Sequence, residues 1–218
     1  MDADGSDQVQ LTNTEGFNTQ PAWFPDGRRL AISSNRRGDK ADIYILTLNK
    51  ARDDVVGVRR LTTDSKPDWE PVVSPSGKRI TFRRPMPSSD EIFTLNTNTR
   101  EGRANRAVRL IDNRWFEWNR DLSPNGERFV FERWRYGNGV YHSAGNYSMR
   151  SDGNGDWTEL GDAASGGPAF SPDGTQIAYV DWSDNNIWRM KSNGNHRVRV
   201  TTSFTHEEAS SLSWQPLP

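Results

Sequence analysis

The chain of 218 residues contains no cysteine and only three histidines. Without cysteine it cannot form a disulfide or a thiolate metal site. An imidazole metal centre would need His142, His196 and His206 to converge, and by repeat position they belong to three different kinds of connection. We therefore expect no cofactor and no metal. No segment is long and apolar enough to span a bilayer, and these residues carry no secretory signal.

Neither sign of charge dominates, since 28 basic residues face 29 acidic ones and the net charge is -1. No global field therefore draws nucleic acid or an anionic membrane. Arginine and aromatic residues alternate over residues 133–136, which could stack on bases, but one such stretch is weak evidence and we predict no nucleic-acid partner.

Apolar residues are also scarce, at 33% of the chain with a mean hydropathy of -0.89, which by itself is a composition typical of disorder. The nine tryptophans, five tyrosines and nine phenylalanines indicate otherwise. Many of them recur at fixed positions of a repeat, as expected when each repeated unit packs large side chains against its neighbours. The composition therefore suits a folded chain with a large polar surface.

One short phrase occurs four times and gives this repeat its period. It has three residues, the last of them phenylalanine or serine, followed by proline, a small polar residue and glycine. Its prolines and that of a fifth, broken copy are spaced by 50, 49, 48 and 44 positions, which is in the range of propeller blades and solenoid units. The copies are Ala22–Gly27, Val72–Gly77, Asp121–Gly126 and Ala169–Gly174, with the broken one at Leu212–Pro216.

Each copy has the chemistry of an antiparallel meander. Proline and the polar residue set a tight turn, and glycine supplies its left-handed position. Three short β-prone runs follow each first strand, and no window has an apolar stripe at helical spacing. The sequence predicts an all-β fold, a β-propeller of four-stranded antiparallel blades. The second strands are Arg29–Ile32, Arg79–Phe82, Arg128–Phe131 and Gln176–Tyr179, and the third strands are Ile43–Leu46, Ile92–Leu95, Asn146–Met149 and Ile187–Met190.

The two ends of the chain resemble parts of a blade. Residues 1–5 align with residues 190–194, so the chain opens in mid-blade, and it stops just after a fifth first strand. We predict about four complete blades with partial blades at both ends, hence a piece of a larger ring whose exposed edge strands favour self-association. The alternative is a complete small ring with a degenerate closing blade. The predicted blades are 13–62, 63–111, 112–160 and 161–201, and the partial strands lie in 1–12 and 202–218 of this single domain.

The proline-aspartate-glycine turn, the third strand with an aromatic second residue and the turn leading to leucine-threonine resemble the WD40-like (PD40) repeat of TolB-like propellers. Residues 21–62 match best, and residues 112–160 depart most because a longer loop follows Trp134. The resemblance implies a non-catalytic binding or scaffold module with a protein or peptide partner, and a periplasmic or secreted location for the full-length protein. It leaves open the substrate-gating propeller of a prolyl-oligopeptidase-like protein, and a propeller enzyme acting on carbohydrate.

The connection into each first strand is the most informative variable region, because in propellers it leads to the mouth of the central channel. One residue of each copy stands immediately before the first strand, and tryptophans stand close by in the second and third copies. These residues are Gln20, Glu70, Asn119, Gly167 and Ser211. They could satisfy backbone groups and wedge blades together, or they could bind a peptide or a glycan. The candidate residues are Gln20, Asp68, Trp69, Glu70, Trp115, Glu117, Trp118, Asn119 and His206.

We predict no catalytic residue. No G-x-S-x-G turn is present for a serine nucleophile, and Glu70 with Glu117 would serve as a glycosidase pair only at a separation that sequence does not give. The acidic turns at residues 2–7 and 152–156 offer oxygen ligands for calcium, but they also stand where every blade needs a polar turn and they lack a distal glutamate. We interpret them as turns.

Overall fold

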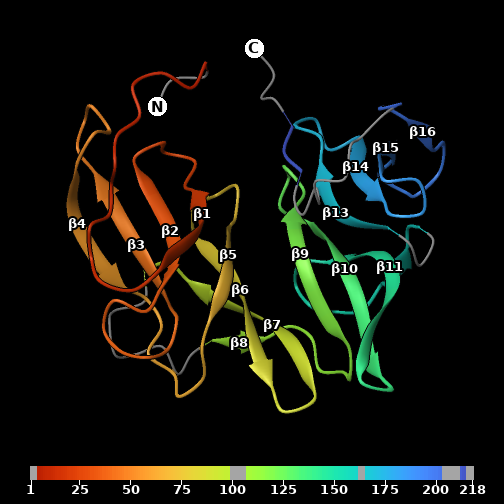
Figure 1. The fold of residues 1–218 in the computed structure, drawn as a ribbon, viewed down its shortest axis with the longest axis horizontal. Coiled ribbons are helices and arrows are strands. Elements are labelled where there is room, and N and C mark those ends of the chain that lie inside the picture. Colours follow the sequence, from red (N-terminus) through yellow and green to blue (C-terminus); the bar gives the residue numbers. More distant parts are fainter. Residues whose placement is uncertain (1–3, 99–106, 162–164, 203–211, 215–218) are drawn as a thin grey trace. The chain divides into compact units, whose positions relative to one another are not determined.

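The computed structural model describes residues 4–98, 107–161, 165–202 and 212–214. All regular secondary structure in these ranges is β-strand (Figure 1), so the predicted all-β class is confirmed. No helix in the described ranges could cross a membrane. The strands are β1 (Asn18–Trp23), β2 (Arg29–Ser34), β3 (Asp42–Leu48), β4 (Val55–Arg60), β5 (Trp69–Val73), β6 (Arg79–Met86), β7 (Ser89–Asn96), β8 (Val108–Arg109), β9 (Phe116–Leu122), β10 (Arg128–Gly137), β11 (Val140–Arg150), β12 (Thr158–Glu159), β13 (Ser165–Phe170), β14 (Gln176–Asp181), β15 (Asn186–Lys191) and β16 (Val198–Arg199).

The strands pair in chain order, as a meander does. Two four-stranded antiparallel sheets run β1-β2-β3-β4 and β13-β14-β15-β16. The strands between them have the order β12-β11-β10-β9-β7-β6-β5 with β8 on β7, which makes one sheet of eight. A single parallel residue pair, Asp90 with Phe116, joins β7 to β9. The predicted four-stranded sheets are therefore present, and the middle two share this bridge. The limits of the four blades and the size of a complete ring stay predictions.

The proline turns have the geometry that their residues predict. The glycine that ends each turn has a positive φ of 61° to 74°, and its amide donates to the carbonyl three residues earlier at 2.7–3.0 Å. The Asp26 carboxylate in the first turn also accepts the amides of Arg28 and Arg29. Each turn therefore closes a hairpin between the first and second strands. These glycines are Gly27, Gly77, Gly126 and Gly174.

The chain divides into two compact units, Met1–Arg84 with Thr94–Val108, and Pro85–Phe93 with Arg109–Pro218. The core of the first unit joins β2 to β3 and contains Leu30, Ile32, Tyr44, Leu46 and Leu48. In the second unit, the two faces of strand β10 contribute side chains to two separate hydrophobic clusters. Phe129 and Phe131 pack with Ile92, Ile111 and Met149, and Val130 packs with Leu160, Phe170, Ile177, Tyr179 and Met190.

This alternation along β10 is the period of a strand buried on both faces. Burying each such side chain contributes about 1.5–3 kcal/mol. The fifth copy of the repeated phrase lies largely outside the described residues. Its Trp214 is described, and the indole Nε1 donates to the carbonyl of Ala169 in β13 at 2.9 Å.

Candidate ligand-binding site

Each first strand contains a β-bulge at the same repeat position. Gln20, Glu70, Asn119 and Gly167 have φ values of 55°, 53°, 46° and 58°. The register with the second strand breaks at each of these positions. The sequence placed these residues immediately before the first strands, and the structure corrects this, because all four lie inside β1, β5, β9 and β13. Proline follows three of them and cannot donate to the ladder, which favours a break there.

In the first unit, the bulge of β5 is tied to the preceding sheet. The Glu70 amide donates to Gln20 Oε1 at 3.0 Å and to Ser33 Oγ at 3.1 Å. The Glu70 carboxylate accepts a hydrogen bond from Arg83 Nε at 2.9 Å. The structure therefore brings the predicted residues Gln20 and Glu70 into direct contact, and both are half-buried.

In the second unit, Glu132 has the same place as Ser33. Glu132 Oε1 accepts the Asn119 amide side chain at 2.8 Å and also the backbone amide of Gly167. Glu132 Oε2 accepts Trp134 Nε1 at 2.9 Å, and the residue is 2% exposed. One buried carboxylate therefore holds two bulges and an indole.

Sequence reasoning missed Ser33, Arg83 and Glu132. Each stands eight positions after its turn proline, from 25 to 33, from 75 to 83 and from 124 to 132. The constant spacing was a usable signal. The chemical identity of the three residues differs, so a search for one repeated residue type would not find them.

The candidates Asp68 and Glu117 lie deeper than a channel mouth would require, since neither side chain is exposed. Arg84 binds Asp68 through two nitrogens, at 2.7 and 3.0 Å. Glu117 accepts Asn113 Nδ2 at 2.9 Å and Arg133 Nη2 at 3.3 Å. Burial raises the pKa of Asp68, and burial raises the pKa of Glu117 to about 7. Both acids therefore form ion pairs inside their units.

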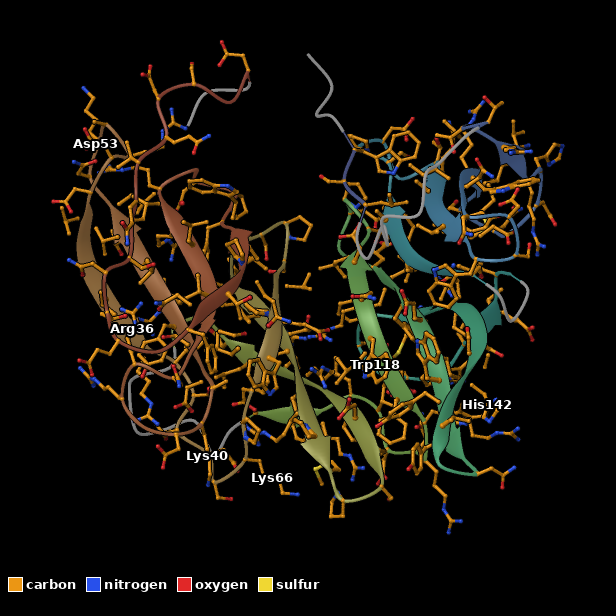
Figure 2. The ribbon with its side chains drawn as sticks, in the orientation of Figure 1. Arg36, Lys40, Asp53, Lys66, Trp118 and His142 are labelled. Atoms are coloured by element: carbon orange, nitrogen blue, oxygen red, sulfur yellow. The ribbon has the colours of Figure 1, made fainter. Side chains whose placement is uncertain are left out.

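The candidate tryptophans all contact other rings or charges. Trp69 stacks on Phe17 with centroids 5.2 Å apart. The guanidinium of Arg133 lies 5.5 Å from the centre of Trp115. Trp118 on β9 (Figure 2) donates its Nε1 to Asp90 Oδ2 at 2.6 Å. His206, the remaining candidate, lies outside the described residues.

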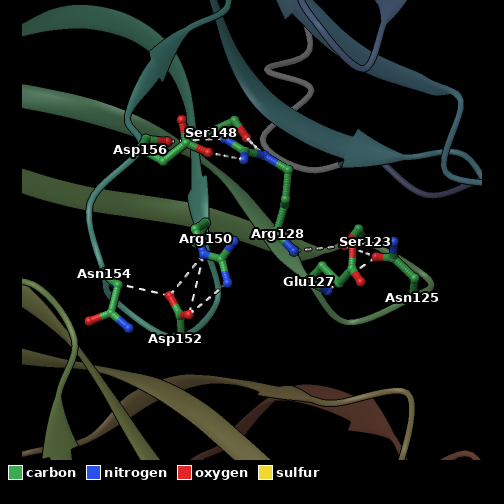
Figure 3. Close-up of polar contacts among 9 residues, drawn as sticks. All are labelled: Ser123, Asn125, Glu127, Arg128, Ser148, Arg150, Asp152, Asn154 and Asp156. Carbon is green, nitrogen blue, oxygen red and sulfur yellow. Dashed lines mark hydrogen bonds and ion pairs between the residues drawn. The ribbon is translucent and has the colours of Figure 1, made fainter.

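A polar hollow of about 400 Å³ lies in the second unit and was not predicted. Figure 3 shows the arginine on its wall, where Arg128 Nη1 binds Asp156 Oδ2 at 2.6 Å and Nε donates to Ser148 Oγ at 2.8 Å. Its cation is therefore neutralised within the protein. The hollow is lined by Ser123, Asn125, Glu127, Arg128, Asp156, Asp173 and Asn193 among others.

The acidic turn considered for calcium borders this hollow. Asp152 binds Arg150 and accepts the Asn154 amide (Figure 3), and the hydrogen bond from Arg150 lowers the pKa of Asp152 to about 2. Both of its outer carboxylates, Asp152 and Asp156, hold arginines. Within the described part of the chain, no group of three histidine, aspartate or glutamate residues could hold a metal.

Comparison with known proteins adds a family and a fold. A family model described as the TolB beta propeller domain, PD40, matches residues 1–147. The chain is 30% identical over 178 residues to the Bacillus subtilis protein called uncharacterized peptidase YuxL, which covers 78% of this chain and 23% of that protein. The chain spans about a quarter of the length of the curated relatives that it matches, 26% and 23%.

Solved structures with the same fold include proteins with different names. The structure of TolB from Acinetobacter baumannii superposes with a TM-score of 0.63 at 21% identity, over 94% of this chain and 48% of that one. An oligogalacturonate lyase from Vibrio parahaemolyticus gives a TM-score of 0.62 at 13% identity, over 89% of this chain and 56% of that one. At these identities the likeness shows the fold alone.

Proposed function

Because the chain belongs to the TolB β-propeller domain family, we propose that it is a non-catalytic binding module. Its partner is a protein or a peptide, and each unit contacts it through the polar residues at its own first-strand bulges. The observation that carries this proposal is the recurrence of a positive φ at Gln20, Glu70 and Asn119, which are polar residues and not glycine.

The backbone at these positions supports a functional reason for the side chains. A left-handed conformation costs a residue other than glycine about 1 kcal/mol. Gly167 avoids this cost at the equivalent position, and the other three copies do not. Gln20 and Glu70 are half-buried and Asn119 is exposed, so part of each side chain faces solvent. Such partly exposed amides and carboxylates, held by hydrogen bonds to other strands, suit hydrogen bonding to a peptide.

The contacts of the two acids favour binding over catalysis. An acid-base pair needs carboxyl groups that reach a substrate. Glu117 has no exposed surface and holds Arg133, and Glu70 accepts a hydrogen bond from Arg83. We therefore propose that neither acid transfers a proton to a sugar, and that Glu70→Gln leaves any carbohydrate turnover of the full-length protein unchanged.

Site-specific photo-crosslinking in cells of the source organism tests the proposed surface. A photoreactive amino acid replaces Gln20 or Asn119, and the matched control carries it at Asp53, an exposed residue between β3 and β4 (Figure 2). We expect one discrete protein adduct from the bulge positions and none from position 53. Purified partner should then bind at least tenfold more weakly to Asn119→Ala in calorimetry. Equal labelling at all three positions would contradict the proposal.

One comparison favours a second function, because the 30% identical relative carries the name of a peptidase. In that case we propose that this chain is the propeller that restricts substrate size for a peptidase domain in the same protein. The test is expression of the full open reading frame. Cleavage of short peptides but not of folded proteins, with size selectivity lost when residues 13–62 are deleted, would support it. A reading frame without a hydrolase domain would exclude it.

A further inference from the structure

The hairpin β10–β11 in the second unit is the longest in the described part of the chain. Its strands have 10 and 11 residues, whereas the equivalent β14 and β15 have six each. A two-residue turn, Asn138-Gly139, joins them with φ values of 53° and 82°. Positive φ at both central residues is the type I′ geometry, whose twist matches that of the strands. The hairpin tip, residues 135–142, is therefore a well-defined structural element.

One face of the hairpin tip is aromatic. Tyr136 and Tyr141 face each other across the strands with ring centroids 5.0 Å apart, and they are 55% and 46% exposed. Tyr141 also contacts Phe116 and Trp118, each at 5.0 Å. Because Trp118 is itself fixed by Asp90, these tyrosines are held in place before any partner arrives. Pre-ordered aromatic side chains lose little entropy on binding.

The opposite face carries one cation, the guanidinium of Arg135. Arg135 pairs with His142 across the strands, and both are exposed, His142 projecting from β11 into solvent (Figure 2). No aspartate or glutamate occurs between Glu132 and Asp152 in the sequence. Arg133 does not add to this surface, because it is 11% exposed and pairs with Glu117.

The outer edge of β11 is open along the hairpin tip. Among the described residues, β12 pairs with β11 only at Tyr147 and Ser148. Residues 140–145 therefore have none of the described strands on that edge. An extended segment added there would send alternate side chains to the two faces, because successive side chains of a strand point to opposite sides.

We propose that the hairpin tip binds an extended segment of another protein by strand addition to β11. In that segment apolar and acidic residues alternate. The apolar side chains pack on Tyr136 and Tyr141, and the carboxylates face Arg135 and His142. Main-chain hydrogen bonds supply affinity and the alternating side chains supply specificity. A second copy of this hairpin is disfavoured as the occupant, since it would bring positive charge against positive charge.

Single-stranded nucleic acid fits the hairpin tip less well. Such ligands need a series of cations along the phosphate backbone as well as aromatic rings. Arg135 is the one arginine of this stretch that is exposed at the tip, because Arg133 is used inside the unit. The residues of the hairpin tip are not among the bulge residues Gln20, Glu70 and Asn119, so the inference is tested independently of the proposed function.

The test uses a fluorescein-labelled decapeptide in which glutamate and valine alternate, with fluorescence anisotropy as the measurement. We expect it to bind the whole chain and expect the matched lysine-valine peptide not to bind. Methylation of alternate backbone amides of the peptide should abolish binding, since strand addition needs those donors. Absence of binding by the glutamate-valine peptide, or unchanged binding after methylation, would overturn the proposal.

Substitutions locate the surface. Arg135→Glu and Tyr141→Ala should each weaken peptide binding at least tenfold. The matched controls are Arg28→Glu, with the same change of charge at an exposed arginine, and Trp23→Ala, with loss of an aromatic residue that is 54% exposed. Both controls should bind as the parent does. Equal effects of Arg28→Glu and Arg135→Glu, or displacement of the peptide by oligothymidylate at micromolar concentration, would assign the binding to general charge or to nucleic acid and overturn the proposal.

Discussion

The two units pair a buried acid with an arginine at the same repeat position, but with different hydrogen-bond geometry. Asp68 in the first unit and Glu117 in the second both stand seven residues before a turn proline, from 68 to 75 and from 117 to 124, and both side chains have no exposed surface. Asp68 meets Arg84 through two hydrogen bonds, at 2.7 and 3.0 Å. Glu117 meets Arg133 through one at 3.3 Å.

The weaker geometry of the Glu117–Arg133 pair leaves buried polar atoms without a hydrogen bond. Oε2 of Glu117 and Nε of Arg133 are buried without a hydrogen-bond partner among the described residues. Arg133 lies instead 4.5 Å from the ring centre of Tyr147 and 4.3 Å from that of Trp157. A bidentate pair compensates the loss of hydration of both ions, and a single bond at an aromatic wall compensates less. The repeat therefore conserves the position of an ion pair within this chain without conserving its quality.

The largest effect should come from breaking the better pair. Asp68→Ala leaves the Arg84 guanidinium, which is 7% exposed, without its bidentate partner. We expect the free energy of unfolding to fall by about 3–5 kcal/mol, measured by urea denaturation. Asp26→Ala, at a carboxylate 39% exposed, is the control and should cost far less. Equal losses for the two variants would mean that the buried pair is not important for stability.

The weaker pair should make stability depend on pH. Burial raises the pKa of Glu117 from 4.5 to about 7. The folded state therefore binds more protons than the unfolded state between these values, so this contribution is present below pH 4.5 and is lost as pH rises through 7. The loss is about 3 kcal/mol.

Glu117→Gln should remove that pH dependence. Relative to the parent, the variant should gain stability on going from pH 5 to pH 8, by about 3 kcal/mol for this one group. Urea denaturation of both proteins at the two pH values gives the double difference, which cancels the other titrating groups. A double difference near zero would show that Glu117 is ionised in the folded state throughout.

The acceptors of the bulge amides extend the comparison of the two units. In the second unit Glu132 alone accepts Asn119, Trp134 and the Gly167 amide. Glu132→Ala should therefore lower the free energy of unfolding by about 2 kcal/mol or more, because three donors, among them the buried amide of Gly167, lose their partner. Thermal and urea denaturation measure it, and a loss below that of an exposed glutamate, Glu127→Ala, would contradict the assignment.

The smallest effect is expected in the first unit. The Glu70 amide has two acceptors, Gln20 and Ser33, and Ser33→Ala removes only one of them. We expect a loss of about 0.5–1 kcal/mol. The double variant with Gln20→Ala should lose more than the sum of the two single losses. Strict additivity would show that the two acceptors act independently.

The sequence was sufficient for the fold class because its turns and periods are local. Pro25 and Gly27 specify their turn without help from distant residues, and the core residues Leu30 and Ile32 show the strand period of two. The sheet face toward which the side chains of Asp68 and Glu117 point is not set by local sequence. A bulge adds one residue to a strand and moves the following side chains to the other face, so the register had to be known before these acids could be placed inside.

The hairpin β10–β11 is a second region in which strand register could not be read from the local sequence. Asn138 and Gly139 are a strong hairpin signal, and the longer loop predicted after Trp134 is in fact the tip of this hairpin. In the sequence, Arg133 and Arg135 look alike, because both are cations beside aromatic residues. Its ion pair with Glu117 depends on strand register, which no pattern within residues 133–136 records.

The bulge contacts also imply a direction of assembly. Where the donor is a backbone amide, it lies later in the chain than its side-chain acceptor, as with Glu70 and Ser33 or Gly167 and Glu132. Phe170 likewise donates its amide to Asp121. During synthesis from the N-terminus, each new first strand would meet acceptors that have already left the ribosome, and its strained backbone would be satisfied on arrival. We expect the chain to be completed sheet by sheet in the order in which it is translated.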